Sequence, residues 1–194
     1  MPKDWNKAYA EGDTPWDKGY ASPPLRAFLK THRLEGNVVV PGCGAGYDVR
    51  LLAEQGVSVL GLDIAPLALE KARAVPPAGD EVYALADILN LPASYCRKFD
   101  AVVEHTCLCA LNPVDRKAYV QSVQKLLKPG GKYLAIFFRK VSAYNGKDPP
   151  HPISGDEIES LFASDFEILE RTIPQETYPG RPIGSEEVCL MRKS

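Results

Sequence analysis

The chain has 194 residues, a length typical of one domain with a sizeable core. Hydrophobic residues make up 45% and charged residues 25%, which excludes a disordered chain, and the formal net charge of −2 predicts no nucleic-acid partner. The first residues lack the apolar core of a signal peptide, and no apolar run approaches the ~20 residues that cross a bilayer, so we expect no membrane partner.

Short β-branched runs alternate with helical stretches through the middle of the chain. Strands are predicted at residues 37–41, 57–63, 81–87, 99–105 and 132–138. Helices are predicted at residues 47–54, 66–74 and 113–127, and the turn KPGG, residues 128–131, ends the last of them. Near-continuous apolar strands that alternate with helices predict a parallel sheet with helices on both faces.

The pattern changes after residue 138. Residues 139–152 are polar and rich in turn formers, which predicts a loop near the active face. Ser154, with Glu157 three residues later, predicts a helix that begins with a capping box. Two closing strands are predicted at residues 166–173 and 185–193, and they should pair antiparallel because no long crossover helix fits between them.

These elements predict an α/β fold with a doubly wound, mostly parallel, seven-stranded sheet and a C-terminal antiparallel hairpin. We expect one domain over residues 1–194, with an N-terminal segment at 1–35, a ligand-binding core at 36–139 and closing elements at 140–194. The cysteine count is five and therefore odd, which favours reduced thiols in a cytoplasmic protein.

A glycine-rich turn joins the first predicted strand to the first predicted helix of the core. Gly42, Gly44 and Gly46 lie in the run VVVPGCGAG. Glycines let the backbone turn tightly and approach a ligand, and the helix that follows offers unpaired N–H groups. The spacing differs from the G-x-G-x-x-G dinucleotide fingerprint, and the turn alone also fits a strand–helix connection without a ligand.

Acidic residues end the next two predicted strands. Asp63 follows the glycine turn by about 20 residues, where an acid accepts hydrogen bonds from ribose hydroxyls, although it also fits a helix N-cap. Asp87 is placed to accept a bond from an adenine amino group while Ile88 covers the ring, and its alternative is a simple turn acid. With Ile64 beside Asp63, these residues predict a nucleoside site at the carboxyl edge of the sheet.

These motifs, with the KPGG turn, resemble those of the class I S-adenosylmethionine-dependent methyltransferases, which have a Rossmann-like fold. A narrower resemblance is to the thiopurine, thiol and halide methyltransferase group, and it is carried by the runs TPWD, PGCGAGYDV and EHTCLCALNPVDR. It covers nearly the whole chain and is weakest after residue 138. The resemblance implies S-adenosylmethionine as cofactor, S-adenosylhomocysteine as product and a small-molecule acceptor.

The resemblance also implies a lid. In that group the N-terminal segment folds over the cofactor, which maps the lid aromatics to Trp5, Tyr9 and Trp16. A sulfonium is a cation, and the faces of aromatic rings attract cations. The alternative is that these rings only fasten an N-terminal helix to the domain.

The fourth predicted strand ends in Glu104 and His105, where the transferred methyl group should point. Glu104 is a candidate for contact with the methionine amino group. His105 is a candidate for the acceptor side and for the base that deprotonates a neutral thiol, and its alternative is a buried structural histidine. A metal site with Cys107 and Cys109 is disfavoured, because a fourth ligand and the usual spacings are missing.

The predicted reaction is in-line methyl transfer to a small thiol, bisulfide, thiopurine or halide. An acceptor that is already ionised needs no base, and a small apolar cavity between the lid and residues 143–152 would favour such polarizable nucleophiles. Two other functions stay open: an NAD(P)-dependent reductase, which shares the glycine turn and Asp63, and a non-catalytic nucleoside-binding protein. We expect a monomer or a weak dimer.

Overall fold

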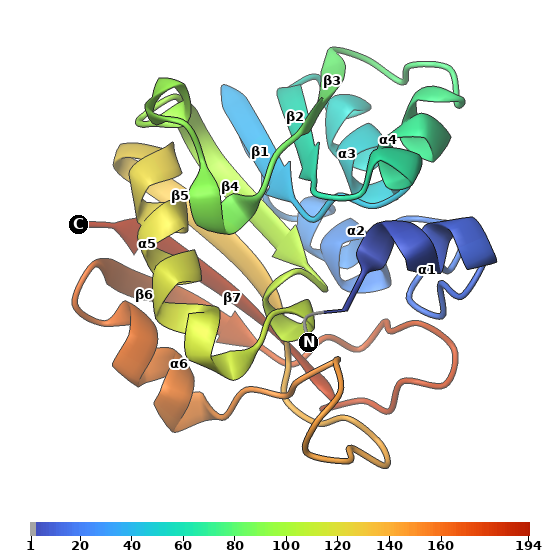
Figure 1. Ribbon diagram of the computed structural model, residues 1–194. Coiled ribbons are helices and arrows are strands. Elements are labelled where there is room, and N and C mark those ends of the chain that lie inside the picture. Colours follow the sequence, from blue (N-terminus) through green and yellow to red (C-terminus); the bar gives the residue numbers. More distant parts are fainter. Residues whose placement is uncertain (1–2) are drawn as a thin grey trace.

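Seven strands form one sheet in the computed structural model, which describes residues 3–194 (Figure 1). Their order across the sheet is β3-β2-β1-β4-β5-β7-β6. They span β1 (Asn37–Pro41), β2 (Ser58–Asp63), β3 (Glu81–Leu85), β4 (Phe99–His105), β5 (Leu127–Phe138), β6 (Phe166–Thr172) and β7 (Glu186–Lys193). The strands β1 to β5 are parallel, and β7 pairs antiparallel with both β5 and β6. The predicted doubly wound sheet with a closing hairpin is confirmed.

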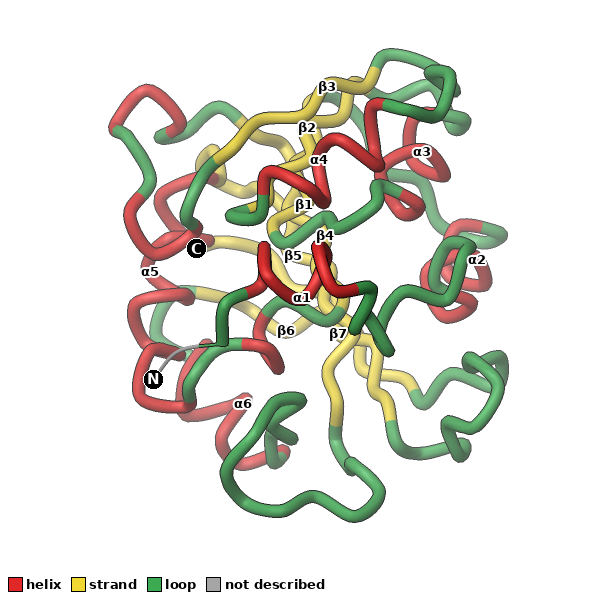
Figure 2. Tube along the Cα trace, turned by 45° about the vertical axis from the view of Figure 1, so that its right-hand side comes forward, coloured by secondary structure: helices red, strands yellow, loops and turns green. Residues whose placement is uncertain are grey.

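Helices cover both faces of this sheet (Figures 1 and 2). They are α1 (Trp5–Glu11), α2 (Pro23–Leu29), α3 (Tyr47–Ala53), α4 (Pro66–Arg73), α5 (Arg116–Leu126) and α6 (Gly155–Phe162). Buried side chains of α5 and α6 form one apolar cluster with the sheet, and those of α2 and α3 form another on the opposite face. No helix within residues 3–194 is long and apolar enough to cross a membrane.

The side chains of β4 alternate between these two clusters, as strand geometry requires. Val102 packs in the cluster of α5 and α6, whereas Ala101 and Val103 pack in the cluster of α2 and α3. The last two residues of the strand continue this alternation. Glu104 is therefore directed toward the α5 face and His105 toward the α3 face.

The KPGG turn was expected to separate the last core helix from the fifth strand, and the structure places it inside the strand. Helix α5 ends at Leu126, and β5 begins at Leu127, which already pairs with Phe99. The next pair joins Ala101 to Lys132, so the four turn residues bulge out of β5 opposite a single residue of β4. Gly130 supplies the positive φ of +72° that this bulge needs.

Three helix starts show how local signals compare with the structure. Ser154 accepts a hydrogen bond from the Glu157 amide at 3.1 Å, which confirms the predicted N-cap of α6. The Glu157 carboxylate, however, binds Arg116 on α5, so only half of the capping box forms. The helix predicted from residue 113 starts as a 3-10 turn and becomes α5 at Arg116. Helix α2, seven residues capped by Ser22, was not predicted.

Candidate active site

The glycine turn after β1 lies against the end of β4 and the N-terminal helix. Gly42, Gly44 and Gly46 have φ values of +61°, +54° and +77°. A Cβ on Gly42 would lie 2.9 Å from Cys107 Sγ, and a Cβ on Gly44 would lie 3.0 Å from the Tyr9 hydroxyl. The positive φ values and the close neighbours therefore both require glycine at these positions.

Asp63 ties this turn to the end of β2. Its carboxylate accepts hydrogen bonds from the Gly44 amide at 2.8 Å and the Ala65 amide at 2.9 Å. Burial raises the pKa of Asp63, and the amides that donate to it oppose this rise. The N-cap of α4 is Ala65, so the N-cap alternative for Asp63 is wrong. Each oxygen keeps a lone pair for a ribose hydroxyl, and the adjacent Ile64 is 52% exposed.

Asp87 has a local structural role. It caps the 3-10 turn Ile88–Asn90, accepting from the Leu89 amide at 2.9 Å and from the Asn90 side chain at 2.6 Å. Ile88 is buried in the apolar cluster on the α5 face. The turn-acid alternative is therefore what the geometry shows for Asp87, and a contact with adenine would use its remaining lone pairs.

The three predicted lid aromatics do come together. Trp16 packs edge-on against Trp5 and Tyr9, with ring centroids at 5.2 and 5.9 Å, and its indole N–H donates to the Tyr9 hydroxyl at 3.2 Å. The Lys3 ammonium lies 4.7 Å from the Trp16 centroid and 5.2 Å from that of Trp5. The cation against these rings in the structure is the chain's own Lys3, and the contact of the rings with a sulfonium stays a prediction.

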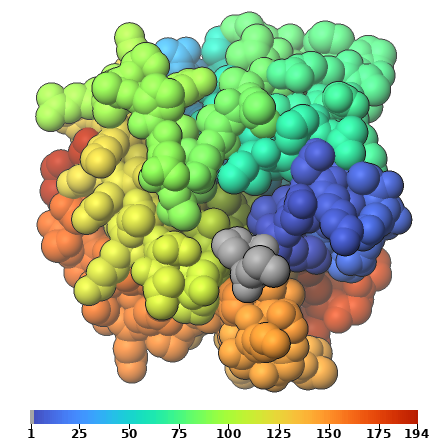
Figure 3. Space-filling model, in the orientation of Figure 1, coloured from blue at the N-terminus to red at the C-terminus, as the bar shows by residue number. Residues whose placement is uncertain are grey.

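The same aromatics also fasten α1 to the domain, so the structural alternative is compatible with the lid. Tyr9 packs with Ala65 and Ala68, and the Asn6 side chain accepts from the Leu67 amide at 3.0 Å. Helix α1 thus lies beside α4 at the carboxyl edge (Figure 2). In the space-filling view, the N-terminal segment (blue) and the loop after β5 (orange) lie on the same face of the molecule (Figure 3).

Glu104 is a buried carboxyl at the end of β4, with only 1% of its surface exposed. It accepts hydrogen bonds from the amides of Leu108 at 2.9 Å and Cys107 at 3.2 Å. Burial raises the pKa of Glu104 to about 7, although these bonds and the charge of His105 act against the rise. Near neutral pH this carboxyl is therefore partly protonated, and a cation placed beside it would favour its ionised form.

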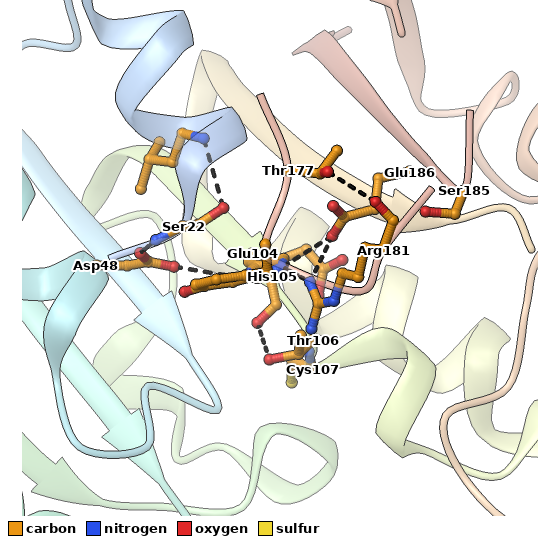
Figure 4. Close-up of polar contacts among 12 residues, drawn as sticks. Ser22, Asp48, Glu104, His105, Thr106, Cys107, Thr177, Arg181, Ser185 and Glu186 are labelled. Carbon is orange, nitrogen blue, oxygen red and sulfur yellow. Dashed lines mark hydrogen bonds and ion pairs between the residues drawn. The ribbon is translucent and has the colours of Figure 1, made fainter. Parts of the chain in front are cut away.

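His105 lies between two carboxylates (Figure 4). Its Nε2 is 3.2 Å from Glu186 Oε1 and its Nδ1 is 3.6 Å from Asp48 Oδ2, and its ring stacks with those of Phe138 and Tyr178. Burial lowers the pKa of His105, but the two carboxylates outweigh burial and raise it to about 9. This pKa favours the protonated imidazole, which cannot accept a proton from a thiol, whereas the position of Arg181 Nη1, 3.0 Å from Nε2, favours the neutral ring.

Three residues of this region were not singled out from the sequence. With His105 they form a charged cluster that consists of Asp48, His105, Arg181 and Glu186. Arg181 donates to Glu186 Oε1 at 2.6 Å, and its guanidinium lies 4.5 Å from the Phe138 ring and 4.8 Å from the Tyr178 ring. The side chains around His105 are therefore charged, and the apolar cavity predicted between the lid and residues 143–152 stays a prediction. The sequence feature that could have indicated this cluster is the pair of acids near the start of the last predicted strand, because buried strands seldom carry unpaired acids.

Other candidate sites are not supported by the geometry. A hollow of about 360 Å³ lies at the amino ends of β1 and β2, lined by residues such as Gly36 and Val57, at the opposite edge from the glycine turn. Within residues 3–194, no three His, Cys, Asp or Glu side chains are grouped to hold a metal ion. The carboxyl edge is thus the site where the predicted residues converge, and its side-chain-free turn, carboxylates and cation-holding rings fit S-adenosylmethionine.

Comparisons with known proteins agree with this geometry. The model of the thiopurine S-methyltransferase family matches residues 1–179. A probable thiol methyltransferase 2 of Arabidopsis thaliana is 33% identical, over 98% of this chain and 84% of the relative. A thiocyanate methyltransferase 1 of Brassica oleracea is 32% identical, over 81% of this chain and 70% of the relative.

A solved structure with the same fold is the 1,6-didemethyltoxoflavin-N1-methyltransferase of Burkholderia thailandensis, which contains bound S-adenosylhomocysteine. Its TM-score is 0.77 at 20% identity, and the match covers 98% of this chain and 86% of that one. At this identity the match concerns the fold alone.

The role of Asp63 is tested by Asp63→Ala. Loss of the carboxylate removes the acceptor of ribose hydroxyls and frees the Gly44 amide, so S-adenosylmethionine should bind about 1–3 kcal/mol more weakly, roughly 5- to 150-fold. Calorimetry measures this change, with Asp80→Ala at the amino end of β3 as the control. Equal affinities of wild type and Asp63→Ala would contradict the assignment.

The lid is tested by hydrogen exchange. Amides of residues 5–16 should exchange more slowly when S-adenosylmethionine is added, because a cation against the rings orders the segment. The strands β4 and β5 provide an internal control that should change little. If the segment is equally protected with and without the cofactor, it is a fixed structural element.

The raised pKa of Glu104 leads us to expect that cofactor binding depends on pH. A cation pairs with the ionised carboxylate, and the pKa of about 7 means that binding at lower pH must first release a proton. Affinity should therefore fall as pH drops below about 7, approaching tenfold per pH unit, in a range where the α-amino group of the cofactor (pKa ~7.7) stays protonated. Calorimetry should show this slope in the wild type and its loss in Glu104→Gln.

Proposed function

Because this chain belongs to the thiopurine S-methyltransferase family, we propose that it methylates a small sulfur acceptor at the carboxyl ends of β4 and β5. It is an S-adenosylmethionine-dependent methyltransferase, which rules out the reductase and the non-catalytic binder. The observation that carries the choice of acceptor is the similarity of the chain to a thiol and a thiocyanate methyltransferase. The two carboxylates beside His105 raise its pKa to about 9, which disfavours the neutral imidazole that a base requires.

The cofactor half of the site follows from the residues around the glycine turn. S-adenosylmethionine supplies an electrophilic methyl group on a sulfonium. Asp63 accepts from the ribose hydroxyls, and Glu104 pairs with the methionine ammonium. The faces of Trp5 and Trp16 stabilise the positive charge and exclude water from it.

The acceptor half lies on the α3 side of β4. Arg181 and His105 lie at this edge, and Asp48 and Glu186 hold both side chains in place, so an acceptor meets a charge-balanced, preorganised polar cluster. Methyl transfer from an activated donor depends mainly on alignment, worth at most ~7–11 kcal/mol. His105 in this proposal is a positioning cation rather than a base.

The acceptor class is supported by the thiol and thiocyanate methyltransferases to which the chain is similar. Halides and thiopurines belong to the same proposal, since their nucleophilic atoms are equally polarizable. All five cysteines are free, which supports a cytoplasmic setting. We expect a monomer or a weak dimer acting on a small molecule.

An acceptor screen tests the proposed function. The protein should release S-adenosylhomocysteine with small thiols, bisulfide, thiopurines, thiocyanate or iodide, and much less with amines and phenols. His105→Gln should retain most of this activity and lose far less than the ~10²–10⁴-fold expected for loss of a general base. Turnover of an amine or phenol, with none for any thiol or halide, would overturn the acceptor class and leave the methyl donor unchanged.

A further inference from the structure

Glu186 is a buried carboxylate that uses only one of its oxygens. The residue is 0% exposed at the start of β7. Its Oε1 accepts from Arg181 Nη1 at 2.6 Å and lies 3.2 Å from His105 Nε2, so both cations of the charged cluster converge on the same atom. Its Oε2 has no hydrogen-bond partner within residues 3–194 and no contact with solvent.

The neighbouring acid shows that this arrangement is unusual in the same strand. Glu187 is also buried, but one oxygen accepts from Arg171 Nε at 2.5 Å and the other from Arg139. A buried acceptor without a partner is destabilising, and more so when it is charged. The hydrogen bond and charge of His105, with Arg181, outweigh burial and hold the pKa of Glu186 below its usual value, so Oε2 carries negative charge.

The unpaired oxygen lies on the acceptor side of the site. Glu186 pairs with Phe138 at the end of β5, and its carboxylate contacts His105 at the end of β4. Figure 4 shows the same cluster reaching α3, which follows the glycine turn, through Asp48. A nucleophile that reached His105 at this edge would therefore come close to Glu186 and Arg181 once the segment that covers them moves.

We propose that Glu186 Oε2 recognises acceptors that carry a proton on the attacking sulfur and takes that proton during methyl transfer. This inference rests on the proposed function. The acceptor sulfur forms a bond to the methyl carbon as the bond between that carbon and the donor sulfur breaks. The S–H electron pair stays on the acceptor sulfur, the proton passes to Oε2, and it leaves to solvent with the product.

The proton transfer is favourable only as the new bond forms. A carboxylate is a weaker base than a thiolate, but a sulfur that is becoming alkylated holds its proton far less tightly. Thiols and bisulfide have such a proton, whereas iodide and thiocyanate do not. Those two anions also meet the negative charge of Oε2, so Glu186 disfavours them.

Access to Oε2 requires movement of the segment that covers it. Residues 173–185 carry Arg181 over the cluster, and they are fastened to the N-terminal part of the chain by two contacts: the Tyr178 hydroxyl donates to the Tyr20 carbonyl at 2.7 Å, and Glu176 pairs with Lys30 at 2.7 Å. Gly180 and Gly184 have positive φ and no atoms within 4 Å of an added Cβ. Displacement of this segment opens the way to Glu186.

The experiment compares wild type with Glu186→Gln, and Glu187→Gln is the matched control on the opposite face of β7. Rates of S-adenosylhomocysteine release give kcat/KM for a small aliphatic thiol and for iodide across neutral pH. The thiol-to-iodide ratio should fall about 10²-fold or more in Glu186→Gln and stay near the wild-type value in Glu187→Gln. An equal fall for both acceptors would reduce Glu186 to a structural role and overturn the inference.

The pH profile of the wild type gives an independent test that does not need the variant to fold. Below the thiol pKa, and with S-adenosylmethionine saturating at each pH, the wild-type rate with the thiol should stay nearly flat, because the neutral thiol reacts. In Glu186→Gln it should instead fall with the thiolate fraction, tenfold per pH unit. A wild-type rate that follows the thiolate fraction overturns the inference alone. Absence of turnover with every sulfur and halide acceptor overturns the proposed function as well.

Discussion

The alternation of side chains at the end of β4 divides the site in two. Glu104 and His105 are adjacent, yet a strand directs them to opposite faces of the sheet. Glu104 meets the amides of Cys107 and Leu108 on the α5 face, whereas His105 meets Asp48 of α3 and Glu186 of β7. The proposed cofactor half and the proposed acceptor half are therefore defined by two residues that share one peptide bond. A shift of β4 by one residue would exchange the faces to which the two side chains point.

Burial has different consequences for the two groups. The pKa of Glu104 is set by loss of water, because amide donors are weaker partners than ions, and it rises to about 7. The pKa of His105 is set by its two carboxylate neighbours, which outweigh burial and raise it to about 9. Both groups hold protons near neutral pH, but only Glu104 is close to its titration point. Only this carboxyl can therefore respond to a cationic ligand within the physiological range.

The sequence predicts most of the fold, and it also singles out the residues of the proposed cofactor half, because those signals are local. Apolar runs predict the strands, and the glycine turn and Asp63 predict the nucleoside site; each of these signals lies within a few residues of the chain. Asp48 and the pair Arg181 and Glu186 lie far from His105 along the chain, and the antiparallel register that sets Glu186 opposite Phe138 helps to bring them together. Nothing near residue 105 shows that two carboxylates and a guanidinium will surround it.

The charged cluster contributes little to stability, so its position calls for another reason. Buried ion pairs roughly offset their desolvation, and apolar residues of similar volume often give a more stable protein. What the cluster supplies is orientation: Asp48 and Glu186 hold the cations on His105 and Arg181 before any acceptor arrives, and preorganised charges need no rearrangement during the reaction. Glu187 on the same strand satisfies both of its oxygens with Arg139 and Arg171. Glu186 leaves Oε2 without a hydrogen-bond partner within residues 3–194, and this oxygen is the one that the proposal assigns to the acceptor.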